Sequence, residues 1–121
     1  MVRPSRPRVL IVDDDPAVGR SFARVLAAEA EVDVAGSSAE ALDRIERGES
    51  FDLVVCDVMM PGMTGPQLFD RVKALNPVTA AAFVFVTGGA TREEESRMRA
   101  TGARCLSKPL AMETVRQLLR P

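Results

Sequence analysis

The sequence predicts a doubly wound α/β domain built on a five-stranded parallel sheet. Short apolar runs rich in valine alternate along the chain with segments whose apolar residues recur at helical spacing. Turn and capping residues separate the two kinds of segment, and no internal repeat or low-complexity tract interrupts them. Strands that alternate with helices favour a parallel sheet covered on both faces by right-handed crossovers. We therefore expect the flavodoxin-like strand order 2-1-3-4-5.

Five of the apolar runs are predicted to be strands. They are Val9 to Asp13, Val32 to Ala35, Leu53 to Cys56, Ala82 to Val86 and Arg104 to Leu106. The third run is too short for a helix and is apolar throughout. Both of its faces should therefore be buried, as in the middle of a parallel sheet.

Five helices are predicted between and after these strands. Four of them start at capping sequences, which are Asp15-Pro16, Ser37 with Glu40, Thr64 with Gln67, and Thr91 with Glu94. In the fourth helix Met98 is the only large apolar residue, so we expect this helix to pack lightly and to be the mobile element. A fifth helix follows the last strand and carries Val115, Leu118 and Leu119 on one face.

The composition describes one domain of ordinary character. The chain has 121 residues, of which 46% are hydrophobic and 27% are charged, enough for a sizeable core. Its net charge of −1 gives no reason to propose nucleic acid or an anionic membrane as a partner. The chain has no histidine, which excludes histidine-based acid–base catalysis and phosphohistidine chemistry on its own residues.

Residues 1–8 read as a basic, proline-rich leader, and residues 9–121 as the domain itself. We expect Arg3, Arg6 and Arg8 to lie in a disordered, solvated segment rather than to bind phosphate, and we assign that segment no function. The apolar run from Val9 to Val12 is too short for a signal peptide or a membrane span. The sequence therefore predicts a cytoplasmic protein without membrane insertion.

Acidic residues follow two strands that the expected order makes neighbours. Asp13, Asp14 and Asp15 close the first strand, and Asp57 closes the third. The carboxyl ends of these strands meet at the switch point of the sheet, where such folds bind ligands. Asp13, Asp14 and Asp57 should converge there, and their like charges require a cation or a lysine. An oxygen-rich cluster of this kind suits Mg²⁺, whereas Asp15, followed by Pro16, is expected to cap a helix.

The last two strands deliver further polar groups to the same edge. Thr87-Gly88-Gly89 ends the fourth strand, and Ser107-Lys108-Pro109 follows the fifth. Each motif has an ordinary structural interpretation when it is taken singly. Thr87-Gly88-Gly89 alone would be a loop, Lys108-Pro109 alone would be a surface turn, and an acidic run before a helix would be a cap. Taken together, carboxylates, a hydroxyl and an ammonium at one edge are the groups that a phosphoryl-transfer site needs.

These motifs carry a resemblance to a known family. They are Val-Asp-Asp-Asp-Pro at 12–16, Asp57 followed by Met-Met-Pro-Gly-Met-Thr-Gly at 59–65, Val-Thr-Gly at 86–88, and Lys-Pro at 108–109. In their order and spacing, the chain from Val9 to Leu119 resembles a response-regulator receiver domain of two-component signalling. The resemblance implies that Asp57 accepts a phosphoryl group from a histidine kinase or a histidine phosphotransfer domain.

The resemblance also implies roles for the other site residues. Asp14, Asp57 and the backbone carbonyl of Met59 would bind Mg²⁺, with Asp13 acting on the ion through water. The domain would be a signalling switch and not an enzyme with a separate substrate.

In the same family pattern, Thr87 and Lys108 would contact the phosphoryl oxygens, and the Lys108-Pro109 peptide bond would be cis. The response would change the surface of the fourth helix, fifth strand and fifth helix toward an effector that the sequence does not identify.

The chain departs from the family pattern at a few positions. Cys105 stands where many receivers have a tyrosine or phenylalanine, which leaves the coupling to the output surface open. In this missing aromatic residue and in the loop that follows Thr87, the chain resembles receivers attached to hybrid sensor kinases. Met59 and Gly89 offer no polar side chain to orient water, so we expect slow self-dephosphorylation. Cys56 and Cys105 should not form a disulfide, because an intervening strand separates them by about 9–10 Å, beyond the reach of about 7 Å.

Two other classes of protein remain as alternatives. One is a receiver-like interaction module that is no longer phosphorylated, which the complete set of site residues disfavours. The other is a phosphatase or phosphotransferase acting on small molecules through an aspartyl phosphate. The chain lacks the second acid that such enzymes carry two residues after the acceptor, where Met59 stands, and it has no Walker-type loop.

Overall fold

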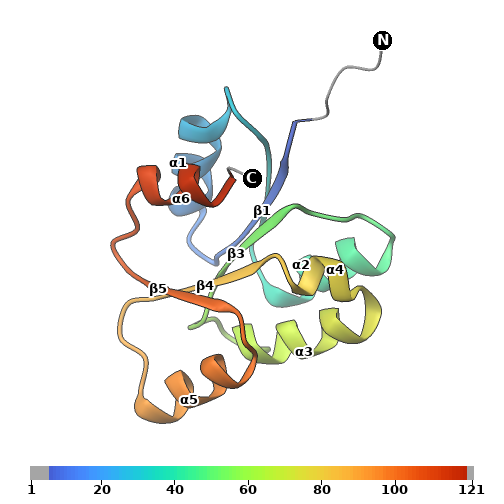
Figure 1. The fold of residues 1–121 in the computed structure, drawn as a ribbon, viewed down its shortest axis with the longest axis vertical. Coiled ribbons are helices and arrows are strands. Elements are labelled where there is room, and N and C mark those ends of the chain that lie inside the picture. The colour runs from blue at the N-terminus through green and yellow to red at the C-terminus, as the bar shows by residue number, and fades with distance from the viewer. Residues whose placement is uncertain (1–5, 120–121) are drawn as a thin grey trace.

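The computed structural model describes residues 6–119, which form a parallel sheet with helices on both of its faces (Figure 1). The strands are β1 (Arg8–Val12), β2 (Glu31–Ala35), β3 (Leu53–Asp57), β4 (Phe83–Thr87) and β5 (Arg104–Ser107). All neighbouring strands are parallel, and their order is β2-β1-β3-β4-β5. This confirms the predicted flavodoxin-like topology, and it makes β1 and β3 neighbours at the switch point.

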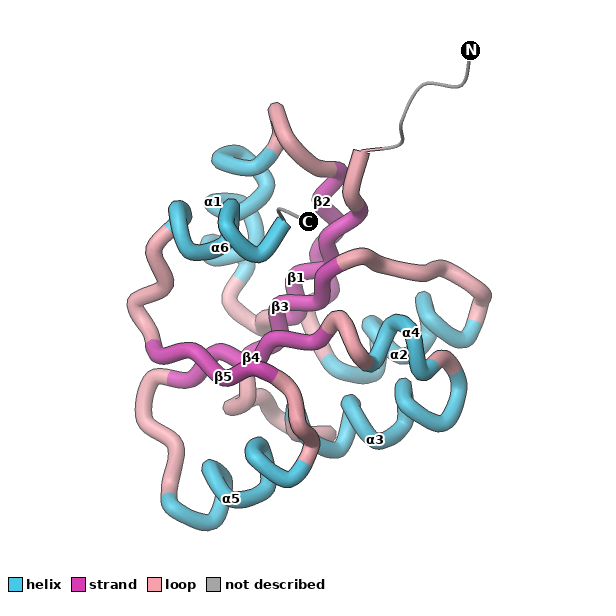
Figure 2. The backbone as a smooth tube through the Cα atoms, in the orientation of Figure 1, coloured by secondary structure: helices cyan, strands magenta, loops and turns pink. Residues whose placement is uncertain are grey.

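Two helical layers cover the sheet. The helices are α1 (Pro16–Leu26), α2 (Ser38–Glu46), α3 (Gly65–Leu75), α4 (Pro77–Ala80), α5 (Arg92–Ala100) and α6 (Met112–Leu119). Figure 2 shows α1 and α6 on one side of the sheet and the other helices on the opposite side.

The side chains of β1 divide between two cores according to the alternation of a strand. Val9 and Ile11 belong to the cluster that includes Phe22 of α1, while Leu10 and Val12 belong to the cluster on the α2 and α3 side. Every residue of β3 is buried, as its uniformly apolar run predicted.

The predicted helix starts are confirmed by their caps. The side chains of Asp15, Ser37, Thr64 and Thr91 each accept a hydrogen bond from a backbone amide in the first turn of the helix that follows. At the last two the reciprocal bond from Gln67 and Glu94 completes a capping box. These caps fix where the chain leaves each strand end and turns back over the sheet.

The expectation of five helices was wrong by one short element. Asn76 ends α3, and its side chain also accepts a hydrogen bond from Thr79 N at 3.1 Å and so starts α4. Pro77 fits the first position of this helix because it needs no amide hydrogen there. A helix of one turn shows no apolar periodicity, which is why the sequence pattern did not reveal it.

Helix α5 is lightly anchored, as expected. Met98 is its one buried residue, and the remaining side chains are charged or exposed. Its ion pairs, Arg97 with Glu93 and Arg99 with Glu95, lie along its own surface. Exposed pairs of this kind add little stability, and the mobility of α5 stays a prediction.

The domain begins earlier in the chain than the expected boundary after residue 8. Residues 1–5, including Arg3, lie outside the described residues, but Arg8 is the first residue of β1. Arg6 also contacts the fold, because its guanidinium donates a hydrogen bond to the carbonyl of Ala30 at 3.0 Å. Neither Arg6 nor Arg8 therefore belongs to a solvated tail.

An ion-pair network lies at the amino-terminal end of the sheet. Arg8 lies 2.9 Å from Asp33 and 3.0 Å from Glu49, and Arg44 of α2 lies 3.3 Å and 3.0 Å from the same two carboxylates. Both guanidinium groups also lie over the ring of Phe51, at 4.8 and 5.9 Å from its centroid. The network joins β1, β2, α2 and the segment before β3.

The two cysteines are free, as expected. Cys56 is buried in β3 and Cys105 is exposed on β5, and both are register partners of Phe85 in the intervening strand β4. Burial, followed by the nearby charges of Asp57 and Asp13, raises the pKa of the Cys56 thiol. Cys56 is therefore an inert member of the core.

Candidate functional site

Strand order brings three carboxylates together at the carboxyl-terminal edge of the sheet. Val12 pairs with Cys56 in the register of β1 and β3, so Asp13 and Asp57 occupy equivalent positions one step beyond that pair. Oxygen atoms of Asp13, Asp14 and Asp57 all lie within 4.8 Å of one another. The predicted acidic cluster is therefore present, with all three residues placed by neighbouring strand ends.

Burial makes this cluster electrostatically demanding. Asp13 is 5% exposed and Asp57 is 7% exposed, whereas Asp14 faces solvent. Burial raises the pKa of Asp13, and the nearby charge of Asp57 raises it further, while the hydrogen bond from the Asp15 amide opposes the shift. A nearby positive charge therefore stabilises the charged form of Asp13.

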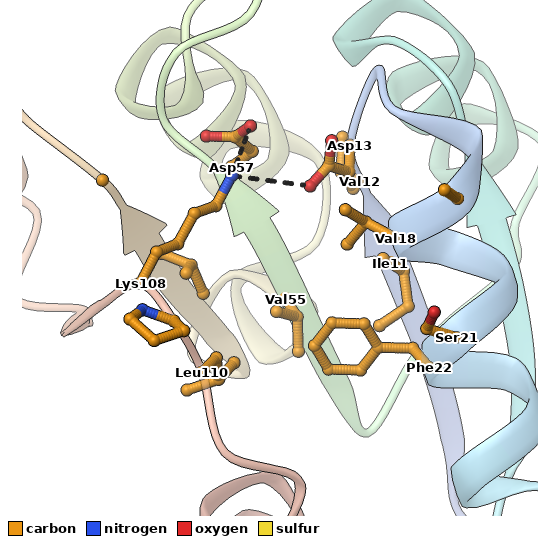
Figure 3. A pocket seen from close by; sticks show the side chains of 14 residues that line it. Ile11, Val12, Asp13, Val18, Ser21, Phe22, Val55, Asp57, Lys108 and Leu110 are labelled. Atoms are coloured by element: carbon orange, nitrogen blue, oxygen red, sulfur yellow. Dashed lines mark hydrogen bonds and ion pairs between the residues drawn. The ribbon is translucent and has the colours of Figure 1, made fainter.

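Lys108 supplies one positive charge to this cluster. Its ammonium reaches from the loop after β5 and lies 3.2 Å from Oδ2 of Asp57 and 3.8 Å from Oδ2 of Asp13 (Figure 3). The backbone amide of Lys108 donates to the carbonyl of Thr87 at 2.8 Å, which fixes the base of the loop. The Lys108-Pro109 peptide bond is cis, as predicted.

Backbone amides hold the other oxygen of each buried carboxylate. Met59 N donates to Oδ1 of Asp57 at 3.1 Å, and Asp15 N donates to Oδ1 of Asp13 at 2.9 Å. The side chain of Met59 is 53% exposed beside the cluster. Asp57 is thus fixed at both oxygens, by Met59 on one side and by Lys108 on the other.

Thr87 ends a strand at the same edge of the sheet, but it is not among the residues that line the cavity beside the cluster. It ends β4, and its hydroxyl accepts a hydrogen bond from Gly89 N at 3.4 Å. Thr87 instead lines a separate cavity of about 190 Å³, together with residues of α5 and β5 that include Met98 and Cys105. The expected contact of Thr87 with a phosphoryl group stays a prediction.

A larger cavity of about 560 Å³ opens beside the cluster. Asp13, Asp57 and Lys108 lie at one end (Figure 3). The rest of the lining is mostly apolar and comes from β1, α1, β3, β4 and the loop after β5. Phe22 and Leu110 face each other across it. Asp57 is therefore buried but borders an open, largely apolar space.

The donor set fits a hard divalent cation. Three carboxylates face a single ammonium in this cluster, so negative charge remains to be neutralised. Carboxylate and carbonyl oxygens are the ligands that Mg²⁺ takes in proteins, and it keeps several waters when few carboxylates are offered.

Gly65 is the last residue of the family motif at 59–65 and the first residue of α3, and it packs closely behind the acceptor. A Cβ placed there would lie 3.1 Å from the ring of Phe85 and 3.3 Å from the backbone carbonyl of Asp57. Such contacts are tighter than side chains ordinarily make. The available signal was a glycine inside the first turn of a helix, where other residues stabilise more.

The fold and the cluster define a class, which is a flavodoxin-like α/β domain with a lysine-bridged acidic site at its switch point. Comparison with known proteins then identifies the family. The chain matches the response regulator receiver domain over residues 9–120 and belongs to that family, the receiver domains of two-component signalling.

Relatives place this domain within longer proteins. The chain is 32% identical to the virulence sensor protein BvgS of Bordetella pertussis over 96% of its own length and 10% of that protein's. It is 33% identical to the response regulator protein FleR of Pseudomonas aeruginosa, over 93% of its own length and 24% of that protein's. The chain thus spans a quarter or less of these relatives.

A solved structure of similar sequence has the same fold. The receiver domain protein (CheY-like) of Methanospirillum hungatei JF-1 superposes with a TM-score of 0.82 at 33% identity, covering 95% of this chain and 94% of that one. Along the described residues, no helix is both long enough and apolar enough to cross a bilayer.

Proposed function

We propose that this receiver domain is a phosphoryl-accepting switch in which Asp57 takes a phosphoryl group from the phosphohistidine of a histidine kinase or a histidine phosphotransfer domain. The observation that carries the proposal is the pairing of Asp57 with Lys108. A buried carboxylate lies 3.2 Å from an ammonium at the end of an open cavity. An incoming phosphoryl group would meet a nucleophile and a cation at one point.

The chain's own groups suit this transfer. An oxygen of Asp57 would bond to phosphorus while the bond from phosphorus to the donor imidazole breaks, its electron pair leaving with the imidazole. Lys108 would neutralise the phosphoryl oxygens, and the Met59 amide would hold the second carboxylate oxygen in place. Water would later split the acyl phosphate into inorganic phosphate and the free carboxylate. The domain would thus act only on itself and would not be an enzyme with a separate substrate.

Mg²⁺ is the proposed cofactor of both steps. Asp14, Asp57 and the carbonyl of Met59 would hold the ion, with Asp13 acting on it through water. When bound, Mg²⁺ would neutralise charge on the phosphoryl oxygens.

The proposed output is a change in the α5, β5 and α6 surface. Thr87 would leave the cavity that it lines with Met98 and Cys105 and bond a phosphoryl oxygen, which would draw the loop before α5 toward the site. Met98 is the single buried residue that anchors α5, which supports α5 as the element that moves. Phosphoryl transfer would take place in the cytoplasm. An effector of unknown identity would then bind the changed surface.

Phosphorylation by acetyl phosphate tests this proposal without a known kinase. Intact-mass spectrometry should show one phosphoryl adduct that depends on Mg²⁺ and disappears in Asp57→Asn. Asp15→Asn is the matched control, since this neighbouring acid caps α1 through Ala17 N and asparagine caps equally well. The adduct should persist there. An adduct that survives in Asp57→Asn, or no adduct in the unaltered chain, would refute the proposal.

A further inference from the structure

The loop from Val58 to Thr64 joins the proposed phosphorylation site to α3. The side chain of Met60 anchors its middle in the core, but the main chain there has few hydrogen bonds. At its start, Met59 N donates to Oδ1 of Asp57 at 3.1 Å. Between Met60 and Met63, all within the described part of the chain, the main chain makes a single hydrogen bond. It comes from another element, because Oγ of Ser38 donates to the carbonyl of Met63 at 2.8 Å.

Ser38 is placed to make this hydrogen bond to Met63. It is the first residue of α2 and is 1% exposed. The cap of α2 is the preceding residue, Ser37, whose Oγ accepts from Glu40 N at 3.1 Å. Two adjacent serines therefore have separate tasks, one within the helix and one across to the loop. Ser38 itself is buried and Met63 is half-buried, so removal of the hydroxyl would leave the Met63 carbonyl without this partner at a partly buried position.

We infer that Ser38 is a positioning residue for the phosphorylation site, acting through the loop that carries Met59. The loop is fixed at one end by the Asp57 carboxylate and at the other by Ser38. Without the Ser38 bond, the Met59 amide would lose its fixed approach to Oδ1 of Asp57, and the carboxylate would be held by Lys108 alone. The consequence for Mg²⁺ binding and phosphorylation rests on the proposed function.

The two serines provide a matched pair of variants. Ser38→Ala removes the bond to Met63 and leaves the cap of α2, whereas Ser37→Ala removes the cap and leaves the bond. Two measurements compare them with the unaltered chain. The first is amide hydrogen exchange by NMR for Met59, Met60, Gly62 and Met63 in metal-free protein. The second is the Mg²⁺ concentration that gives half the maximal rate of phosphorylation by acetyl phosphate.

In Ser38→Ala, we expect faster exchange at Met59 and an increase of roughly tenfold in the Mg²⁺ requirement, the low end of effects seen when support behind a metal ligand is removed. Ser37→Ala should leave both within about twofold, although it weakens α2. Equal effects of the two variants, or unchanged exchange at Met59 in Ser38→Ala, would overturn the inference. If the unaltered chain shows no Mg²⁺-dependent phosphorylation, the proposed function fails, and the metal-free exchange still decides the role of Ser38.

Discussion

The ammonium of Lys108 lies 3.2 Å from Oδ2 of Asp57 and 3.8 Å from Oδ2 of Asp13, so one positive charge faces two buried carboxylates. Asp57 and Asp13 come from neighbouring strands and Lys108 from a loop at the far edge of the sheet. The pairing therefore ties three parts of the chain to one point. It also sets the charge that an incoming cation or phosphoryl group would meet.

Removing this ammonium should destabilise the metal-free protein. In Lys108→Ala the carboxylates of Asp57 and Asp13 lose their positive partner, which should cost about 1 kcal/mol, because hydrogen bonds to charged groups contribute more than this but Lys108 is partly solvated. Urea denaturation at neutral pH measures the loss. The only other lysine in the sequence, the exposed Lys73, is the control, and Lys73→Ala should change stability by less than about 0.5 kcal/mol. Equal stability of the two variants would contradict the prediction.

The network at the amino-terminal end of the sheet should make stability depend on acid pH. Hydrogen bonds from Arg44 and then Arg8 hold the pKa of Glu49 below its ordinary value of 4.5, because they favour the charged form. A lowered pKa stabilises the fold above pH 4.5, and the stabilisation is lost as the pH falls through the folded value. Glu49→Gln should therefore lower the free energy of unfolding at neutral pH, by an amount that shrinks below pH 4.5.

Denaturation of this variant across pH 3 to 7 (about one unit between points) checks the sign. Glu46→Gln, an exposed glutamate in the last turn of α2, is the control and should show no such pH-dependent difference. A Glu49→Gln deficit that grows toward acid pH would contradict the assignment.

Gly19 should tolerate no side chain. It lies on the face of α1 that packs against β2, where an added Cβ would fall 2.6 Å from Cγ1 of Val34. Valine is stiff at this bond, so Gly19→Ala should destabilise by about 1–3 kcal/mol through overpacking, despite the better helix propensity of alanine. The double variant with Val34→Ala makes room and should lose less than the sum of the two single changes. Additive losses in chemical denaturation would show that the contact is not the cause.

Self-dephosphorylation should be slow and should respond to Met59. This side chain is exposed beside the site and has no group that can orient a water molecule. Met59→Asn should shorten the lifetime of the aspartyl phosphate, while Met59→Ala serves as the control that removes the thioether without adding polarity. Decay of the intact-mass adduct after removal of acetyl phosphate measures both. Faster decay in Met59→Ala than in Met59→Asn would count against this account.

Most of the fold could be predicted because its determinants are local. Apolar runs mark the strands, and the four caps at Asp15, Ser37, Thr64 and Thr91 mark helix starts. Errors arose where a local signal was short or ambiguous. Helix α4 is a single turn hidden behind Asn76-Pro77. Arg6 and Arg8 resembled a solvated tail because their partners, the Ala30 carbonyl for Arg6 and the carboxylates of Asp33 and Glu49 for Arg8, are distant in sequence.

The site was predictable to the extent that strand order alone determines it. Asp13 and Asp57 converge because β1 and β3 are neighbours, and the position of Lys108 follows from the end of β5. The contacts around them depend on side-chain directions that the sequence does not encode locally. The bond from Ser38 to Met63 and the position of Thr87 beside the cavity of α5 and β5 are of this kind.

Chemical trapping at the acceptor tests the central claim most directly. The chain is treated with acetyl phosphate and Mg²⁺ and then with borohydride, which reduces an acyl phosphate to an alcohol and so converts the phosphorylated aspartate to homoserine. Peptide mass spectrometry then locates the change. The account predicts homoserine at position 57 and at none of Asp13, Asp14 and Asp15. Homoserine at one of those three positions, or at no position, would contradict it.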